Sequence, residues 1–91
     1  MEHHFTAHIE RSGDMDAAYV VVPIDIRKEY GKGRLKVEAT FDGVPYSGSV
    51  VNMGVKDADG NICYIIGINK AIRQRIGKTF GDSVDVILKT V

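Results

Sequence analysis

The sequence predicts a mainly β domain in which six short strands close into one small barrel, with two short helices covering its open ends. Three observations predict this fold: apolar and polar residues alternate in several segments, the order strand, strand, short helix, strand occurs twice, and the two copies share local sequence. Because 91 residues suffice for one hydrophobic core, we expect a single domain over residues 1–91, with half-repeats at approximately 5–41 and 46–90.

The first copy begins with alternating apolar residues over 5–9, the pattern of a half-buried strand. After a turn, residues 17–22 are apolar without interruption, so we expect a strand buried on both faces and stopped by Pro23. Asp25 is placed to cap a short helix, and Gly31 supplies its left-handed end. These signals predict two strands and a helix of fewer than two turns.

A hairpin is the clearest feature of the middle of the chain. Residues 35–41 alternate, and Asp42-Gly43 is a tight-turn dipeptide that folds them back onto residues 46–53. A second turn is predicted at 57–61, leading into an apolar strand over 62–66. The hairpin therefore joins the last strand of the first copy to the first strand of the second.

The second copy ends as the first does, with a short helix and a strand. Asn69 is a good N-cap, Ile72 and Ile76 share one helix face, and Gly77 lies where the helix should end. Residues 83–91 then alternate as a final strand. Because Val-Pro-Ile-Asp precedes the first helix and Ile-Gly-Ile-Asn the second, we interpret the two copies as an internal duplication.

Composition excludes some function classes. Twelve Lys and Arg balance twelve Asp and Glu, so no overall charge attracts the chain to nucleic acid or to an anionic membrane. No apolar run reaches the length of a membrane span, and residues 1–11 do not resemble a signal peptide. The single cysteine, Cys63, fits a reducing compartment, so we expect a cytoplasmic protein.

Several short motifs lie at matching positions of a known family. They are residues 37–39, the run Asp-Gly-Val-Pro-Tyr-Ser-Gly-Ser at 42–49, Met53-Gly54, and the helix-to-strand segment from Asn69 to Val84. In these motifs, and over nearly the whole chain, the sequence resembles the bacterial and archaeal family of unknown function numbered nineteen-oh-five. The resemblance implies a double-split β-barrel and implies no established activity.

The second half, from Ile68 to Val84, is also similar to the repeat of AbrB-type transcription regulators and antitoxins. Those proteins make their barrel from two chains, whereas here one chain carries both halves. Gly67-Ile68-Asn69 stands where the regulators usually carry Pro before Lys. Because the pseudo-dimer is already closed, we expect a monomer.

Basic residues gather in two stretches, 27–36 and 70–78, which hold nine of the twelve cations. If the halves are related by pseudo-symmetry, the two stretches could together contact phosphates. A solvated helix face explains the same pattern. The residues we select as possible nucleic-acid contacts are Arg27, Lys28, Lys70, Arg73 and Arg75.

Other motifs fail on spacing or context. Gly77-Lys78-Thr79 lacks the earlier glycine of a phosphate loop and follows a helix instead of opening one. His4 and His8 are roughly 13 Å apart along a strand, while His3 points the other way, which disfavours a metal site. The acidic turn at 57–61 lacks the spacing of a calcium loop, and Cys63 is interpreted as a small buried hydrophobe.

We therefore predict no catalytic residue, no metal ligand and no cofactor. The favoured function is a non-catalytic binding or interaction module with a protein or nucleic-acid partner. Nucleic-acid binding in the manner of AbrB-type regulators is the first alternative, and a small-molecule enzyme with a pocket at a barrel end is the second.

Overall fold

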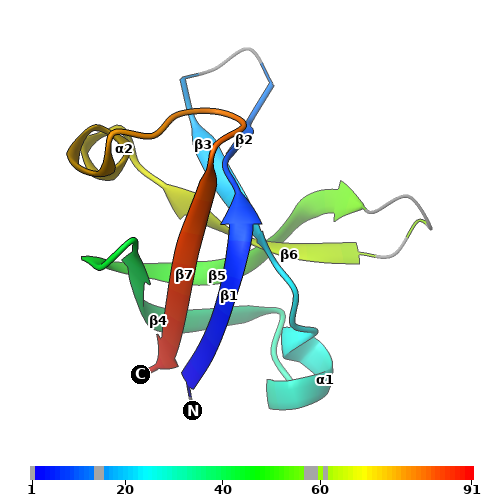
Figure 1. Cartoon of the computed structure of the whole chain (residues 1–91). Helices are drawn as coiled ribbons and strands as arrows, with labels where there is room; N and C mark the ends of the chain where they lie inside the picture. Colours follow the sequence, from blue (N-terminus) through cyan, green and yellow to red (C-terminus); the bar gives the residue numbers. More distant parts are fainter. Residues whose placement is uncertain (1, 14–15, 57–59, 61) are drawn as a thin grey trace.

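A computed structural model describes residues 2–13, 16–56, 60 and 62–91. The structure is mainly β: seven antiparallel strands form one curled sheet, a half-barrel, and two short helices lie against it (Figure 1). The elements in chain order are β1 (Glu2–His8), β2 (Glu10–Arg11), β3 (Ala18–Val22), α1 (Ile26–Tyr30), β4 (Arg34–Phe41), β5 (Val44–Lys56), β6 (Ile62–Ile68), α2 (Lys70–Ile76) and β7 (Ser83–Thr90).

The strands follow the order β1-β7-β4-β5-β6-β3-β2 across the sheet. The predicted hairpin is confirmed: β4 pairs with β5 from Arg34↔Val51 to Phe41↔Val44, and Asp42 and Gly43 turn the chain with positive φ angles of 50° and 86°. Strand β1 pairs with β7, so the two ends of the chain lie side by side (Figure 1).

The strands at the two edges of the sheet, β1 and β2, are joined in the chain by a single residue. Ile9 alone separates β1, which pairs with β7, from β2, which pairs with β3. The backbone of Ile9 is held by the turn before β7, because its N–H donates to the carbonyl of Asp82 and its carbonyl accepts from the N–H of Gly81. Ile9 is 1% exposed, so the residue that links the β1–β7 and β2–β3 ladders is buried in the core.

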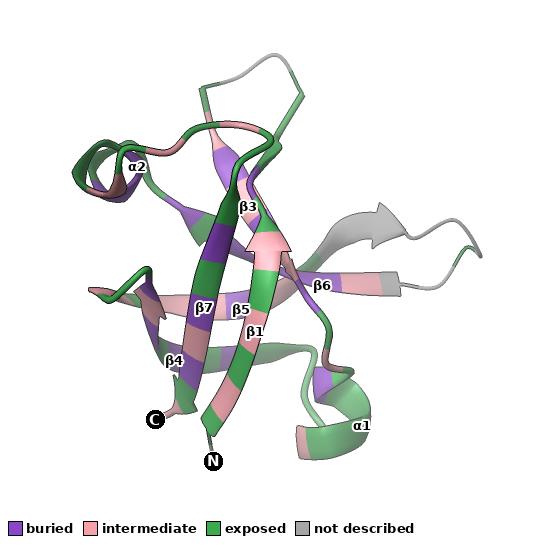
Figure 2. Ribbon diagram, viewed as in Figure 1, coloured by how far each residue is buried: buried purple, intermediate pink, exposed green. Residues whose placement is uncertain are grey.

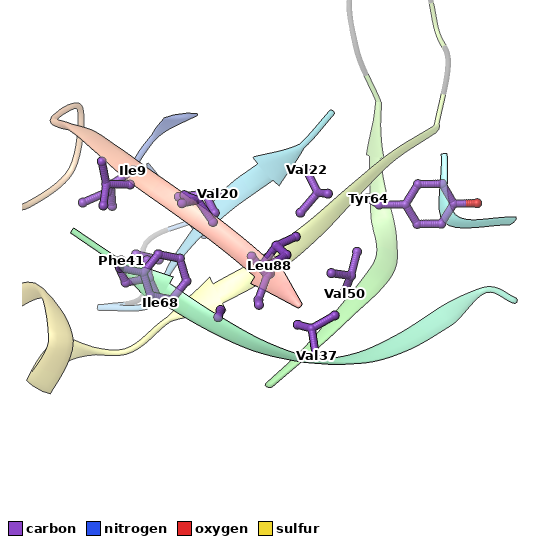
Figure 3. Packing of buried hydrophobic residues seen from close by; sticks show 14 of the residues in the cluster. Ile9, Val20, Val22, Val37, Phe41, Val50, Tyr64, Ile68 and Leu88 are labelled. Atoms are coloured by element: carbon purple, nitrogen blue, oxygen red, sulfur yellow. The ribbon is translucent and has the colours of Figure 1, made fainter. Parts of the chain in front are cut away.

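The core fills the concave side of the curled sheet (Figures 2 and 3). Alternation along each strand directs one set of side chains inward, and the largest fully buried ones come from β3 to β7, from α1 and from Ile9 between β1 and β2. They are Phe41, Ile9, Ile26, Ile66, Ile68, Val20, Val37, Val50, Val84 and Val86. The interior is therefore occupied by packed aliphatic side chains and one phenylalanine.

Both predicted helix caps are confirmed. The Asp25 carboxylate accepts from the N–H of Lys28, and the Asn69 side-chain oxygen accepts from the N–H of Ile72. Both helices end at glycines in the left-handed region, Gly31 and Gly77, as their positions predicted. The Asp82 carboxylate accepts from the N–H of Thr79 and so stabilises the turn before β7.

Two burial predictions were wrong in detail. Strand β3 is not buried on both faces: Ala18, Val20 and Val22 point into the core, whereas Tyr19 and Val21 are half-buried on the convex side. Cys63 is half-buried as well, because Tyr64, Ile66 and Ile68 take the inward positions of β6. An unbroken apolar run does not distinguish a fully buried strand from one whose outer face is only partly covered.

The turn predicted at 12–14 is described only in part: Gly13 has a φ of 62°, and Asp14 lies outside the described residues. Most of the turn predicted at 57–61 also lies outside them. Across the described ranges, no helix is long and apolar enough to cross a membrane.

Candidate functional site

Helix α2 carries an unusual buried charge. Its N-cap at Asn69 sets the helical phase, which turns Ile72 and Arg73 toward the protein. Of the described residues, Arg73 alone is charged and buried, with 6% of its surface exposed. Because burial of a charge is costly unless the group is paired, the surroundings of Arg73 are the first place to look for a site.

Asp16 is the acidic partner of Arg73. The Nη1 atom of Arg73 donates to the Oδ1 atom of Asp16 at 3.3 Å, and Nη2 donates to the main-chain carbonyl of the same residue, also at 3.3 Å. Lys70, one helical turn before Arg73, places its Nζ 3.5 Å from Oδ2. The hydrogen bond from Arg73, with the charges of Arg73 and Lys70, lowers the pKa of Asp16, so this carboxylate is ionised at neutral pH.

The Phe80 ring lies next to the same guanidinium. The Cζ atom of Arg73 is 5.0 Å from the ring centroid, and that of Arg11 is 5.4 Å from it. The face of the Phe80 ring attracts both cations. The Nε atom of Arg73 is buried, and none of the described residues accepts a hydrogen bond from it.

Two hollows meet at Asp16, Lys70 and Arg73, and we call them together the α2 groove. The first, of about 320 Å³, continues along the helix to Gln74, Lys78 and Thr79. The second, of about 270 Å³, continues over a less polar floor made by Ala18, Tyr46 and Ile68. The groove thus offers two cations at its centre and an apolar surface at one end.

Lys78 closes the first hollow and is itself held in place. Its Nζ lies 2.6 Å from Oδ2 of Asp42 and donates to the carbonyl of Ser83 at 2.6 Å. The hydrogen bond from Lys78 lowers the pKa of Asp42. This pair ties the end of α2 to the β4–β5 turn and gives the groove a rigid wall.

The structure separates the five residues selected from the sequence as possible nucleic-acid contacts. Arg27 and Lys28 are exposed on α1, whereas Lys70, Arg73 and Arg75 belong to α2, at the opposite end of the molecule in Figure 1. Arg73 is buried, contrary to the solvated helix face that the charge pattern favoured. The two basic stretches therefore do not form one contiguous cluster.

The histidines divide between two faces of β1, as their alternation predicted. His4 and His8 are exposed, while His3 is half-buried with its Nε2 atom 2.7 Å from the Tyr30 hydroxyl, which joins β1 to α1. The Nδ1 atom of His8 lies 3.2 Å from Oγ of Ser83, a contact that follows from their opposed positions in the β1–β7 ladder. In the part of the chain that the structure describes, no group of three or more His, Cys, Asp or Glu side chains could hold a metal ion.

Sequence reasoning missed two members of the site, Asp16 and Phe80. Asp16 is 57 residues from Arg73 in the chain, and nothing in its local pattern indicates that contact. Phe80 lies in the turn after α2, where an aromatic residue beside two arginines is a weak signal at most. The available signal was that Arg73 follows Ile72 directly, on the face of the helix that turns inward.

Comparison with known proteins gives one match. A family model described as "Domain of unknown function (DUF1905)" matches residues 5–88, nearly the whole chain. A search of the curated proteins finds no match.

Proposed function

This chain belongs to the family described as Domain of unknown function (DUF1905), and we propose that it is a non-catalytic binding module whose ligand site is the α2 groove. One observation carries the proposal: Arg73 is buried beside two surface hollows, with its guanidinium held by Phe80 and by Asp16. Burial of an arginine costs free energy, and recognition of an anion by the fixed guanidinium gives a functional reason for that burial.

The first half of the chain supplies an internal comparison. If the caps Asp25 and Asn69 are equivalent, Ile26 of α1 corresponds to Lys70, and Glu29 corresponds to Arg73. Ile26 is buried in the core and Glu29 is exposed, so the same place in the first half carries no cationic pair. This difference supports assigning the site to α2 alone.

The duplication and the barrel are part of the proposal. If β1 and β2 count as one strand bent at Ile9, the sheet has six strands, the number that the proposed double-split barrel requires. Exchanging the halves then turns the β1–β7 pair into the β5–β4 pair and the β2–β3 pair into the β5–β6 pair. The β3–β6 and β4–β7 pairs map onto themselves, as a duplicated unit requires.

We further propose a monomer, because both halves that would meet in a dimer are in one chain. A reducing, cytoplasmic setting is supported by the single free cysteine, Cys63.

The test of the groove is an amide ¹H–¹⁵N titration of the whole chain with sodium acetate as a carboxylate probe, with sodium chloride at equal ionic strength as control. We expect acetate to shift signals of residues 16–18 and 69–78 and to leave those of 26–31 unchanged. Shifts of equal size around both helices would contradict a site at α2. The same titration with a mixed-sequence DNA duplex tests the alternative: salt-sensitive shifts around both α1 and α2 would favour nucleic-acid binding over the groove.

A further inference from the structure

In the α2 groove, Arg73 and Lys70 already contact a residue of the same chain, Asp16. Arg73 contacts the side-chain carboxylate of Asp16 and also the main-chain carbonyl of Asp16. Lys70 contacts the second carboxylate oxygen. These three contacts are those that a foreign Asp residue in an extended peptide would make, since the side chain and main chain of one residue are recognised together.

The contacts of Asp16 are easily exchanged. Both hydrogen bonds from Arg73, one to the carboxylate and one to the main-chain carbonyl of Asp16, are 3.3 Å long, slightly longer than usual for N–H···O bonds, and the ion pair with Lys70 is 3.5 Å. The Asp16 side chain is 57% exposed, whereas that of Arg73 is only 7% exposed. The cation is therefore fixed in the protein, while its acidic partner is held loosely at the surface.

The apolar lining of the second hollow indicates which kind of side chain a ligand carries beside its carboxylate. Ala18, Tyr46 and Ile68 line the hollow next to Lys70 and Arg73. An apolar side chain beside the acidic one would cover this floor and exclude water from the ion pairs, which strengthens them.

We propose that the α2 groove binds an acidic peptide segment of a partner protein, in which an Asp or Glu carboxylate replaces that of Asp16 between Lys70 and Arg73 and an adjacent apolar side chain packs on Tyr46. Asp16 is then a built-in competitor that occupies the site when the partner is absent. This inference rests on the proposed function and adds the chemistry of the ligand and the role of Asp16.

The experiment measures fluorescence anisotropy of a labelled short peptide of alternating Asp and Leu, titrated with the whole chain. Asp16→Asn removes the competing charge at constant size, and we expect it to bind the peptide about fivefold more tightly, the gain that corresponds to losing an exposed ion pair. Lys70→Gln should bind it about threefold to fivefold more weakly. Lys28→Gln, the same change on α1, is the matched control and should bind as the unsubstituted protein does.

The two proposals fail differently. If the peptide binds and Lys70→Gln weakens it, but Asp16→Asn does not tighten it, the competitor role is wrong and the groove remains. If neither the unsubstituted protein nor Asp16→Asn binds the peptide, while acetate still shifts the signals of the groove, the peptide ligand is wrong. The absence of both peptide binding and acetate shifts overturns the proposed function itself. Equal binding of a peptide of alternating Asn and Leu also overturns the inference, because recognition would then not depend on the carboxylate.

Discussion

Replacing Gly48 by alanine tests how tightly Tyr46 is packed beside the groove, on the face of β5 that Gly48 and Tyr46 share with the buried Val37 and Ala39 of β4. A Cβ atom at Gly48 would lie 2.5 Å from Cε2 of Tyr46, closer than real Cβ contacts, and 3.2 Å from its Cζ, which is tighter than most of them. The Tyr46 ring lies over this glycine and packs against Phe41, with ring centroids 6.0 Å apart. The substitution therefore forces the Tyr46 ring to move away from its place in the wall of the α2 groove.

The expected loss of stability is the difference of two effects. Overpacking costs about 1–3 kcal/mol, and the lower entropy of alanine in the unfolded chain returns about 0.4–1 kcal/mol. We therefore expect Gly48→Ala to lower the free energy of unfolding by about 1–2 kcal/mol. For a domain of this size, the corresponding decrease in Tm is about 5–15 °C.

The assay is thermal and urea unfolding followed by circular dichroism, with near-ultraviolet spectra to report the environment of the tyrosines. Gly67→Ala is the matched control, since it is also a strand glycine and its added Cβ would meet nothing closer than the Ala18 carbonyl at 3.8 Å. We expect the control to be as stable as the unsubstituted protein or slightly more stable. If Gly48→Ala matches the control in stability and in its near-ultraviolet spectrum, the packing of Tyr46 over Gly48 is wrong.

Three further substitutions test the core, a helix cap and an ion pair. Phe41→Ala removes the largest fully buried side chain and should cost about 3–5 kcal/mol in urea unfolding, whereas Val91→Ala, at a residue 77% exposed, should cost less than about 0.5 kcal/mol. Asn69→Ala removes the α2 cap and should cost about 1 kcal/mol, with loss of amide protection confined to the first turn of α2; protection lost evenly along the chain would contradict this. The folded-state pKa of Asp42 lies below its unfolded value, so the stability it adds is present at neutral pH and is lost as the pH falls through the lowered folded value. Asp42→Asn should therefore be less stable than the unsubstituted protein near neutral pH, and the difference should vanish once the pH is below the lowered folded pKa of Asp42; a difference that stays constant as the pH falls would contradict the role of the pair with Lys78.

Local signals were sufficient to predict much of the fold. The alternation in β4, the Asp42-Gly43 turn and the caps Asp25 and Asn69 each depend on residues close together in the chain, so the sequence states them directly. Ile9 was different, because nothing in the alternation of the first strand shows that the chain changes its pairing partner there.

The site was predicted less well than the fold. Charge clustering drew attention to Arg73 and Lys70, but it grouped them with Arg27 and Lys28, which belong to the other end of the molecule (Figure 1). Arg73 is covered by Asp16 and by Phe80 in the turn after α2. Asp16 is 57 residues away in the chain, so its contact with Arg73 becomes apparent only in the folded structure. Sequence spacing gives the face of a helix on which a residue lies and not what covers that face.

The most direct test of the α2 groove is the side-chain Nε–H signal of Arg73, assigned through an Arg73→Lys variant and followed while the labelled whole chain is titrated with the peptide of alternating Asp and Leu. Because the terminal nitrogens of the Arg73 guanidinium contact Asp16, exchange of Asp16 for a peptide carboxylate should change the Nε–H signal of the same group in parallel with the groove amides. A saturable shift at Arg73, with Arg27 unchanged, is the predicted result. A signal at Arg73 that stays constant while the peptide binds elsewhere would contradict the assignment of the groove as the ligand site.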